Sequence, residues 1–397
     1  MSSVFYATER AAVRRRPAGT GTIVEVRSDL DALRVLAPDW EALAAEAAEP
    51  NPFYEHWMLL PALEAFGAEG LHCILVWEDG RLGAFIPMRL ERRYRGLPLR
   101  ALRSWRHRNM LLCTPLIRAK SVHNCVAALL RSELAPVVEF EYISSADAFY
   151  GALTEAVSGA GMPWVASDSY ARALLVRDRD PRERFNSNMK NNLRRWEARL
   201  GAQGRISPVR LAPGDDVAAW SEEFMRLEAS GWKGRAGSAL VCREDDRRFV
   251  AEIFPEAFRR GRLIITGLDL EGRALARHIM FAAGEGAFTF KIAYDETYAS
   301  CSPGILAEVD NVRQFMETPG PRWIDSNTAP ESKSYGRVWK DRRTIQRVTI
   351  GARGAGRVAV AALPLMRLAT HWLRRMAANW PVRLRGAGRR SNPAFVR

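Results

Sequence analysis

The spacing of apolar residues along the chain predicts an α/β fold. Short apolar runs between turn residues are typical of strands, and apolar residues at three- and four-residue spacing are typical of helices. In the first half these patterns predict the order β-α-α-β-β-β-α-β-α-β-β. Strands are expected at 22–26, 71–77, 82–88, 110–114, 137–143, 164–167 and 172–176, and helices at 30–48, 53–66, 122–131 and 147–159.

The second half gives a similar series, β-α-α-β-β-β-α-β. It follows a polar run at 178–181 and a helix within 185–204 whose front half is basic. Strands are expected at 206–211, 263–268, 275–283, 287–294, 323–325 and 345–350, and helices at 215–229, at 244–260 and from Pro303 onward. The shared order suggests a tandem duplication. We therefore expect two domains, 22–178 and 179–352, each with a mixed, mostly antiparallel sheet flanked by helices.

The stretch from 275 to 325 carries the most informative local pattern. Its two strands are joined by Gly-Glu-Gly at 284–286, which is hairpin chemistry. Ser302 is a good helix N-cap, Pro303 fits the first helical position, and Gly304 leaves the backbone open. Such a helix start after a strand presents N–H groups to an anion, for example the pyrophosphate of a nucleotide-like cofactor. Ser-Pro-Gly also opens purely structural helices, so both interpretations stay open at this point.

Composition places the chain among globular proteins. Its 397 residues exceed one ordinary core, and 47% hydrophobic with 26% charged residues is typical of a soluble protein. No membrane span or secretory segment is evident, and residues 1–21 are expected to form a disordered basic leader. The five cysteines and six histidines lack the spacing of a disulfide framework or a metal site, so we expect neither.

The net charge of +14 comes almost entirely from the end of the chain. Residues 342–397 contain thirteen arginines and no lysine or acid, which leaves +1 for the first 341 residues. The tail, 353–397, is predicted to form an amphipathic helix with Leu365, Leu368, Trp372, Leu373 and Met376 on one face. It fits an anionic membrane surface, or equally a helix docked on protein. Nucleic acid is a weaker expectation, because the basic residues are confined to the tail.

Four parts of the second half are informative beyond their strand order: NMKNNLRRWEARL (188–200), LEASGWKGRAGSAL (227–240), FKIAYDETYASCSPGILAE (290–308), and WIDSN with YGRVWKDRR (323–343). Through these segments and the order of its strands, the chain resembles the GNAT acyltransferase superfamily. The tandem arrangement is similar to Fem-type peptidyltransferases and to a bacterial GNAT-like group associated with cellulose or exopolysaccharide biosynthesis. The first half supports the likeness by strand order alone.

The resemblance implies transfer of an acyl group, most often acetyl from acetyl-CoA, to an amine or hydroxyl. The usual pyrophosphate loop of the superfamily, Arg/Gln-x-x-Gly-x-Gly/Ala, is replaced here by YASCSPG. Two donors therefore remain open: an acyl-CoA, and an aminoacyl-tRNA as in the Fem enzymes. No metal is implied.

Transfer from a thioester needs a polarised carbonyl, a base and a proton for the leaving thiolate. The catalytic candidates are His278, Lys291, Tyr294, Asp295 and Asp325. His278 is a natural base, although lone strand histidines are often structural. Lys291 is costly inside a sheet unless paired or functional. Asp325 is a base or acceptor ligand at a strand end, Tyr294 a proton donor, and Asp295 either a site residue or a loop cap.

The register of the hairpin decides which candidates share a face. A simple pairing across 284–286 puts Arg277, Lys291 and Asp295 on one side and His278, Phe290 and Tyr294 on the other. A slip of one residue would rearrange this completely.

The binding candidates surround the point where the strand ending at Tyr294 is expected to splay from its neighbour. For the cofactor we expect the backbone of Ile292 and Ala293 with Ser302, Pro303 and Gly304. For the acceptor we expect Glu228, Trp232, Lys233 and Tyr298. Glu228 is a candidate base or alternatively a solvated helix terminus, and Tyr298 is a second candidate proton donor. Trp232 and Lys233 stand between glycines, where core packing hardly explains a large aromatic, so they are interpreted as an acceptor-site wall and an anion contact. Lys190, Arg194 and Arg195 form a basic helix face that is either solvated or an anion contact.

The sequence thus predicts a cytoplasmic tandem GNAT-like acyltransferase, membrane-associated if its tail binds lipid. The second half would bind acyl-CoA and the first half would shape the side of a small-molecule or glycan acceptor. One rival is a Fem-like transferase that depends on charged tRNA. Another is a non-catalytic peripheral membrane adaptor held by its tail.

Overall fold

The structure is a computed structural model that describes residues 21–178, 180–330 and 335–378. The expected leader therefore lies outside the described residues apart from Gly21. The first half contains β1 (Thr22–Arg27), α1 (Leu30–Val35), α2 (Ala37–Ala45), α3 (His56–Phe66), β2 (Leu71–Glu78), β3 (Arg81–Glu91), β4 (Ala101–Ser104), β5 (Leu116–Ile117), α4 (Val122–Arg131), β6 (Val137–Ser144), α5 (Ala148–Gly159) and β7 (Trp164–Val176).

The rest of the chain contains α6 (Ser187–Gly201), β8 (Ile206–Arg210), α7 (Val217–Ser230), α8 (Trp232–Arg235), α9 (Glu244–Arg259), β9 (Leu263–Leu270), β10 (Arg273–Ala283), β11 (Gly286–Tyr294), α10 (Pro303–Glu317), β12 (Trp323–Asp325), β13 (Asp341–Gly351) and α11 (Gly354–Ala378). Short 3-10 helices lie at Pro52–Tyr54, Ala119–Ser121, Pro181–Arg184, Leu240–Cys242, Glu296–Cys301 and Tyr335–Arg337.

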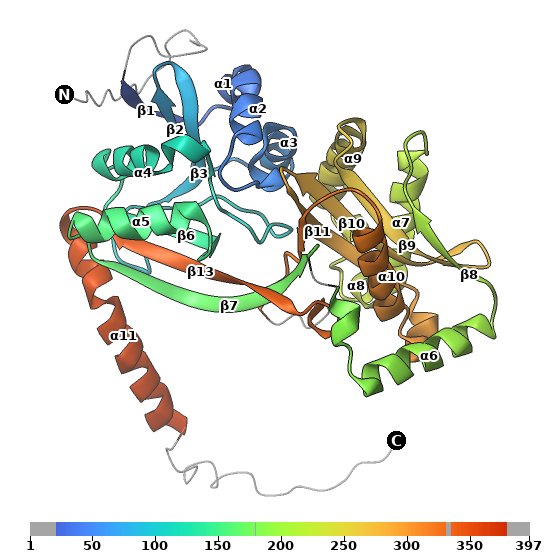
Figure 1. Ribbon diagram of the computed structural model, residues 1–397. Helices are drawn as coiled ribbons and strands as arrows, with labels where there is room; N and C mark the ends of the chain where they lie inside the picture. The colour runs from blue at the N-terminus through green and yellow to red at the C-terminus, as the bar shows by residue number, and fades with distance from the viewer. Residues whose placement is uncertain (1–20, 179, 331–334, 379–397) are drawn as a thin grey trace, which may run out of the picture.

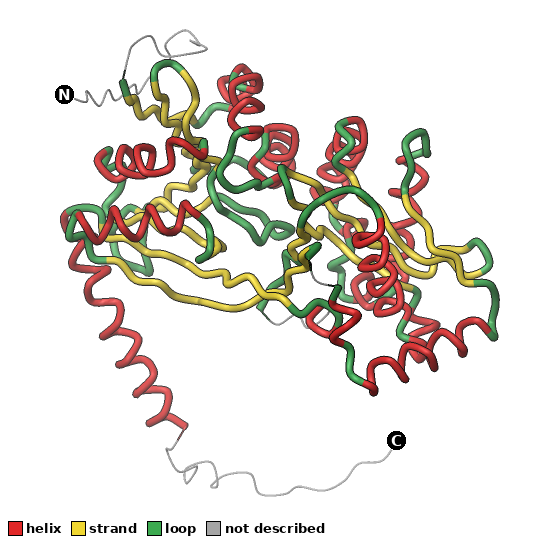
Figure 2. Tube along the Cα trace, viewed as in Figure 1, coloured by secondary structure: helices red, strands yellow, loops and turns green. Residues whose placement is uncertain are grey.

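The strands of the described part join one sheet. Their order is β1-β2-β3-β4-β6-β13-β7-β12-β11-β10-β9-β8, and β5 pairs with β3 outside this path. Figures 1 and 2 show the sheet as a band that runs through both halves. The predicted α/β class, with a mixed, mostly antiparallel sheet flanked by helices, is confirmed, although the two halves share one continuous sheet.

Both halves contain the same local arrangement around a parallel pair of strands. In the first half β4 pairs with β6 in parallel across α4, and β3 pairs antiparallel with β4. In the second half β11 pairs with β12 in parallel across α10, and β10 pairs antiparallel with β11. This repeat of topology is what a tandem arrangement of one unit produces.

Two long strands connect the halves. β7 pairs with β13 along most of its length, and its last residues, Leu174 to Val176, pair with β12 of the second half. β13 lies between β6 and β7 (Figure 1), although it comes late in the chain and the sequence analysis assigned it to the second half.

Apolar layers cover both faces of the sheet. On one face α1, α2 and α3 and, in the second half, α7 and α9 bury one contiguous core that reaches across both halves. The other face is covered by α4 and α5 over the first half. Over the second half the same face packs against α10 and α6. Within the described ranges, no helix combines the length and hydropathy that a membrane span requires.

Three predicted elements were wrong in detail. The strand of the first half expected at 110–114 is not formed; β4 occupies its place, and Met110 and Leu112 are buried in irregular backbone. The helix expected at 30–48 breaks into α1 and α2, because Pro38 stands in the first turn of α2 and cannot continue a helix from α1. The two strands expected within 164–176 are one strand, β7.

A pair of acidic side chains near the sheet junction gives a testable pH dependence. Glu49 accepts a hydrogen bond from the Ala148 N–H, and its other oxygen, Oε2, is buried without a hydrogen-bond partner. Burial and the nearby Asp147 raise the pKa of Glu49 from 4.5 to about 7. Between these two pH values the unfolded carboxyl is ionised while the folded one keeps its proton, so the free energy of unfolding falls as pH rises.

We expect Glu49→Gln to remove this pH dependence and to stabilise the protein above pH 7 by up to about 3 kcal/mol relative to wild type. Urea unfolding from pH 4.5 to 8 measures the difference. Glu155→Gln, at an exposed glutamate, is the control and should follow wild type. Parallel curves for wild type and Glu49→Gln would contradict the raised pKa.

Candidate functional site

Strand β11 separates from its parallel neighbour β12 partway along its length. The two strands pair only from Gly286 to Phe288, whereas β11 continues to Tyr294. On its other side β11 stays paired with β10 up to Tyr294. One edge of residues 289–294 is therefore free of strand pairing. This is the splay that the sequence analysis expects beside the start of α10.

A cleft of about 450 Å³ opens at this splay. Its walls come from α8, the end of β11, the start of α10 and the 3-10 helix at Tyr335–Arg337. The lining residues are Trp232, Lys233, Ile292, Tyr294, Ala299, Ser302, Gly304, Ile305, Glu308, Tyr335 and Arg337. The structure thus brings six of the predicted site residues into one cleft: Trp232, Lys233, Ile292, Tyr294, Ser302 and Gly304.

The start of α10 presents fewer free N–H groups than expected. Ser302 has a left-handed backbone, with φ 47° and ψ 52°, and its side chain makes no capping bond. Its carbonyl oxygen instead accepts the N–H groups of Ile305 and Leu306, at 2.9 and 3.2 Å. Pro303 has no N–H, so the N–H of Gly304 is left to face an anion at the cleft.

Gly304 also controls the width of the cleft. A Cβ at this position would lie 3.1 Å from Cδ1 of Tyr294. Since this is closer than nearly all real Cβ contacts, a side chain here would push against the aromatic ring that forms the opposite wall. A glycine is therefore what keeps the helix start and Tyr294 at their present separation.

Lys233 places a positive charge at the unpaired edge of β11. Its Nζ donates to the carbonyl oxygen of Ile292 at 2.7 Å and to Oε1 of Glu228 at 2.9 Å. The other oxygen of Glu228 accepts the N–H of Leu240 at 2.8 Å, and the Glu228 side chain is fully buried. Glu228 therefore orients Lys233; with both oxygens bonded and no exposure, it is not placed to act as the base that the sequence analysis considered.

Trp232 stands at the mouth of the cleft with 55% of its surface exposed. Its backbone N–H donates to Oε1 of Glu296 at 2.7 Å, and Arg235 bonds to Oε2 of the same carboxylate at 2.6 Å. These bonds fix the short helix α8 to the turn after β11. The largely exposed indole thus borders the cleft while contributing little to the core.

His278 lies behind the cleft. It is 1% exposed, and its Nδ1 lies 2.8 Å from Oε2 of Glu308. Oε1 of Glu308 accepts Nε1–H of Trp339 and, at 3.3 Å, the side-chain amide of Asn311. His278 does not line the cleft, so it can reach an acceptor only through Glu308. The prediction of His278 as a direct base does not fit this burial.

A second, smaller groove of about 340 Å³ adjoins the cleft, with Ile305 and Arg337 common to both. Its remaining lining residues are Arg184, Phe185, Asn186, Asn188, Met189, Asn192, Trp196 and Lys340. The front half of α6 supplies its amides and apolar surface, while Lys190, Arg194 and Arg195 of α6 are exposed. The groove combines positive charge, amide groups and one indole, which suits a phosphorylated, base-containing group.

Lys291 lies on the other face of the sheet, towards the first half. It is partly buried and makes neither a hydrogen bond nor an ion pair with any residue that the structure describes; its Nζ lies 5.8 Å from the centre of the Phe290 ring. Burial lowers the pKa of Lys291, although the negative charge of Glu228 opposes the shift. An unpaired ammonium with a depressed pKa is an unusual feature outside a functional site.

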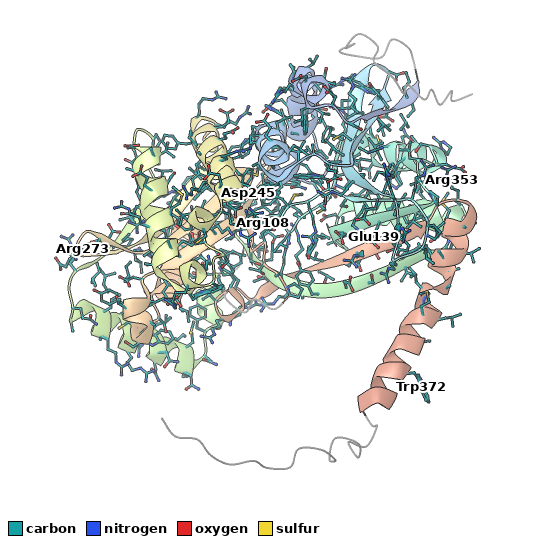
Figure 3. The ribbon with its side chains drawn as sticks, turned by 180° about the vertical axis from the view of Figure 1, so that it is seen from behind. Arg108, Glu139, Asp245, Arg273, Arg353 and Trp372 are labelled. Atoms are coloured by element: carbon teal, nitrogen blue, oxygen red, sulfur yellow. The ribbon has the colours of Figure 1, made fainter. Side chains whose placement is uncertain are left out.

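The surroundings of Lys291 come from both halves of the chain. Arg108 of the first half donates to Asp246 at 2.9 Å and pairs with Asp245, and Asn109 donates to Asp246 at 2.6 Å. Figure 3 shows Arg108 and Asp245 together where the halves meet. The neighbouring His107 is buried, and burial followed by the charge of Arg108 lowers its pKa to about 3, so it stays neutral.

The simple hairpin register was wrong at Phe290. A bulge between Ile279 and Met280 shifts the pairing, so that Ile279 faces Lys291 and Met280 faces Thr289. Phe290 consequently packs against Phe281 and Phe254, on the side of α9. The separation of Lys291 from the cleft-facing Tyr294, which the simple register gave, is present in the structure.

Asp325 is not open to a substrate. It is fully buried and pairs with Arg172 at 2.6 Å and with Arg343 at 3.0 Å. Burial alone would raise the pKa of Asp325, but the two guanidinium groups outweigh it and hold the pKa below its usual value. The prediction of Asp325 as a base is therefore replaced by a structural role at the junction of β7, β12 and β13.

The other predicted site residues lie near the cleft without lining it. Asp295 caps the 3-10 helix Glu296–Cys301 through the Thr297 N–H, which is the alternative that the sequence analysis named. Tyr298 packs with the cluster around Leu306, and Ala293 is buried in the core towards α7. Pro303 is buried as the first residue of α10.

Sequence reasoning missed several residues that the structure places at the site. Glu308, Tyr335 and Arg337 line the cleft, and the sequence analysis named none of them as a site residue. The signal for Glu308 was present: an acid on the apolar side of α10 is expensive unless it is paired. Nothing in the sequence pattern indicates that Arg108 meets Asp246, because the two are 138 positions apart.

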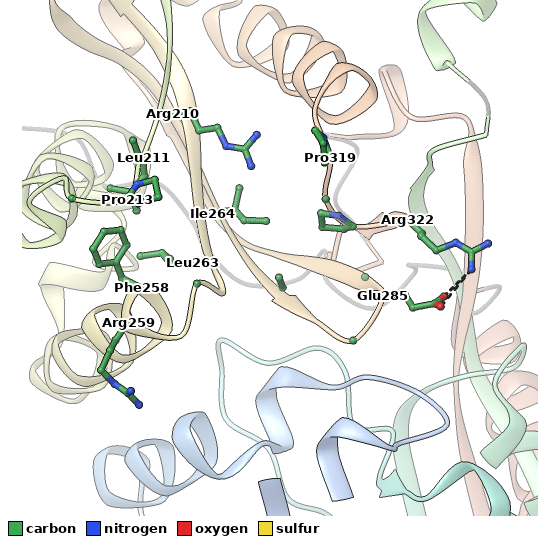
Figure 4. Close-up of a pocket in the computed structure, with 18 residues that line it drawn as sticks. Arg210, Leu211, Pro213, Phe258, Arg259, Leu263, Ile264, Glu285, Pro319 and Arg322 are labelled. Carbon is green, nitrogen blue, oxygen red and sulfur yellow. Dashed lines mark hydrogen bonds and ion pairs between the residues drawn. The ribbon is translucent and has the colours of Figure 1, made fainter. Parts of the chain in front are cut away.

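A cavity larger than the cleft lies at the opposite end of the strands of the second half. It measures about 950 Å³ and is bounded by the start of β9, the 284–286 turn and the segment 319–322. Figure 4 shows its arginines spread around an open rim, with Arg322 turned to Glu285. None of the predicted site residues lines it.

The described residues contain no group of three or more His, Cys, Asp and Glu side chains suited to a metal ion. The chemistry available at the cleft is that of a backbone N–H, a lysine, a glutamate, two tyrosines and an arginine. These groups can bind an anion, polarise a carbonyl and transfer a proton.

Solved structures resemble this chain over most of its length. The C-terminal domain (DUF2156) of a putative lysylphosphatidylglycerol synthetase from Agrobacterium fabrum has a TM-score of 0.50 and 12% identity, covering 84% of this chain and 95% of that chain. FemX has a TM-score of 0.49 and 11% identity over 79% and 95% of the two chains. A tandem GNAT protein from the clavulanic acid biosynthesis pathway has a TM-score of 0.41 and 13% identity, and the match covers 83% of this chain and 99% of that chain. The first likeness shows a shared fold, and no curated protein matches the sequence.

A family model described as "Acetyltransferase (GNAT) domain" matches residues 187–335. The matched range contains the splayed β11, the cleft, α10 and the residues that flank Lys291 in the second half. Residues 187–335 are therefore similar to the acetyltransferase (GNAT) domain family, and the splayed strand and the cleft, which lie within this range, form the candidate functional site.

Proposed function

We propose that the protein is an acyltransferase that moves an acyl group from acyl-CoA, most simply acetyl-CoA, to an amine or hydroxyl of an acceptor. The observation that carries this proposal is the cleft at the splay of β11, inside the range that matches the acetyltransferase domain. The unpaired strand edge offers backbone N–H and C=O groups to the chain that carries the thioester. The helix N-terminus beside it is the positive end of the helix dipole and attracts a phosphate.

In this proposal the donor occupies the cleft and the adjoining groove. The N–H of Gly304 and the charge of Arg337 would meet the pyrophosphate, and the groove with Arg184 and Lys340 would hold the phosphorylated nucleoside. The reacting end would lie along the free edge of residues 289–294. Lys233 is close enough to that edge to stabilise charge developing on the carbonyl oxygen, since it already bonds to the Ile292 carbonyl.

The acceptor would enter from the junction of the two halves, on the Lys291 side of β11. Its nitrogen or oxygen attacks the thioester carbonyl carbon, and the C–S bond breaks. We assign Lys291 as the base that takes the acceptor proton, since its lowered pKa increases the share of neutral amine near neutral pH. In the same proposal the hydroxyl of Tyr294, a residue that lines the cleft, would return a proton to the thiolate of CoA.

Calorimetric titration of the purified full-length chain with acetyl-CoA tests the donor site. We expect wild type to bind and Gly304→Glu to bind at least about tenfold more weakly, because its carboxylate faces the pyrophosphate and its stem crowds Tyr294. Gly304→Gln separates crowding from charge. Gly320→Glu introduces the same charge at the opposite cavity, where its Cβ has room, and should bind like wild type.

Equal affinities of wild type and Gly304→Glu would move the donor away from the start of α10. No heat from wild type at saturating acetyl-CoA would reject acetyl-CoA as donor. Longer acyl-CoA chains and aminoacyl-tRNA would then be titrated in the same way.

An aminoacyl-tRNA donor is the second candidate, favoured by the exposed basic face of α6 next to the adjoining groove. Lys190, Arg194 and Arg195 lie on that helix. The start of α10 also presents few free N–H groups to a pyrophosphate, which weakens the case for acyl-CoA. Binding of charged tRNA that is lost when these three residues are replaced by glutamine, together with absent acetyl-CoA binding, would select this function.

The acceptor is proposed at the level of chemical class. The sequence resemblance directs the search to sugar amines and hydroxyls of envelope polysaccharides or exopolysaccharides. A non-catalytic adaptor role predicts the opposite of an enzymatic role. Deleting residues 365–397 would abolish function, whereas Lys291 could be replaced without loss of function.

A further inference from the structure

Helix α11 leaves the body of the protein after its first turns. Val360 and Leu363 are buried against a small cluster that includes Tyr94 and Val137. Beyond them the helix projects away from the sheet, as Figure 1 shows. Pro364 marks the change, and Leu365, immediately after it, is 69% exposed.

Large apolar side chains form an exposed row along α11. Val358, Leu365, Leu368 and Trp372 are 72%, 69%, 61% and 68% exposed. They are separated by seven, three and four residues, so they share one face of the helix. Figure 3 shows Trp372 extending from the distal part of the helix. An exposed apolar row of this length needs a partner, because single exposed residues are common but contiguous ones are not.

The body of the protein is not that partner. The docked residues Val360 and Leu363 lie on the helix face opposite the exposed row. Continued at seven-residue spacing from Val360, the docked face reaches Arg367 and Arg374 in the sequence. Since the sequence has arginines at these positions, the apolar pattern of the docked face does not continue beyond the first turns of the helix.

The charge of this region selects among the possible partners. Residues 342–397 contain thirteen arginines and no aspartate, glutamate or lysine. A second copy of the chain would fit the three-and-four spacing of a helical pair, but it would bring two strongly positive segments together. A nucleic acid would neutralise the charge but leave the apolar row exposed. A bilayer with anionic headgroups satisfies both features.

We propose that α11 binds the surface of an anionic lipid bilayer, with Val358, Leu365, Leu368 and Trp372 in the apolar boundary. The enzyme body then sits on the opposite side of the helix, held by Val360 and Leu363. This attachment would deliver the protein to acceptors at a membrane, and it stands whether or not the acyl donor is acetyl-CoA.

Flotation of the full-length protein with vesicles tests the proposal. Vesicles of phosphatidylcholine alone are compared with vesicles that also contain phosphatidylglycerol, at low and raised salt. We expect binding only to the anionic vesicles, weakened by salt because the Arg–headgroup attraction is screened. Replacing Leu365, Leu368 and Trp372 together by serine should lower the partition coefficient at least about tenfold, as expected for losing the burial of one or more large apolar side chains.

Val35→Ser is the matched control, since Val35 is an exposed apolar residue of α1, and it should bind like wild type. The replaced residues of α11 are exposed, so the thermal unfolding of the triple variant should also match wild type. Wild type that fails to float with anionic vesicles would overturn the proposal. So would light scattering that shows a dimer dissociated by the triple substitution, which would make a second copy the partner.

Discussion

Replacing Asp325 by alanine is expected to lower the free energy of unfolding by about 3 to 5 kcal/mol. The Asp325 carboxylate is fully buried between Arg172, whose side chain is also inaccessible to solvent, and Arg343. Its loss leaves the buried Arg172 guanidinium without the carboxylate, although the hydrogen bond from Arg172 to the Leu111 carbonyl remains. A buried charge without its partner is one of the few single changes that unfold a domain.

Urea unfolding measures this loss, and Asp341→Ala is the control. Asp341 also pairs with an arginine, Arg184, but at 3.6 Å and with side chains that are 26% and 47% exposed, so its replacement should change stability by less than about 1 kcal/mol. Asp325→Asn keeps the shape of the side chain without its charge, so its loss of unfolding free energy should lie between those of Asp325→Ala and Asp341→Ala. A stable, fully folded Asp325→Ala would show that the ion pair at the junction contributes little.

Replacing Lys291 by methionine is expected to lower kcat/KM at least about a hundredfold while leaving the protein as stable as wild type or more stable. The amine takes the acceptor proton in the proposed mechanism, and methionine cannot. Burial disfavours the charged form of Lys291 in the folded state, so removing the charge removes a free-energy cost of folding. The opposite signs for activity and stability are the signature of a residue kept for its chemistry.

Lys291→Arg separates two roles for this side chain. Arginine keeps the positive charge but does not lose its proton, so a base role predicts loss of activity in both variants, whereas an anchor for an anionic acceptor predicts that arginine suffices. In wild type the rate should rise with pH through the lowered pKa, below the usual 10.5. Lys120→Met, at an exposed lysine of the first half, should match wild type. Full activity of Lys291→Met would remove Lys291 from the mechanism.

The local pattern of the sequence was enough to predict the parts of the site that lie close together in the chain. Tyr294, Ser302 and Gly304 fall within eleven consecutive positions, so strand and turn chemistry alone bring them together. Trp232 and Lys233 could be proposed because glycines on either side make a core role hard to explain.

What could not be predicted depends on contacts between distant segments. Asp325 looked like a base because a strand end suggests a cleft, and nothing near it in the sequence shows that Arg172 will enclose it from 153 positions away. The bulge at Ile279 and Met280 put Phe290 on the other face of the sheet from the one predicted. An alternating sequence pattern does not show where one strand carries an extra residue. The position of β13 had the same cause: its apolar residues specify a strand but not its neighbours.

The return of β13 to the first half constrains how the chain can be made. β13 is the partner of both β6 and β7, and it begins 165 residues after β7 ends. During synthesis the first half therefore emerges with a gap in its sheet and two unsatisfied strand edges, which remain open until nearly the whole chain has left the ribosome. A fragment that stops at residue 178 would lack its middle strand permanently. The two halves thus complete folding together and late, which makes newly made chains dependent on protection against edge-to-edge aggregation.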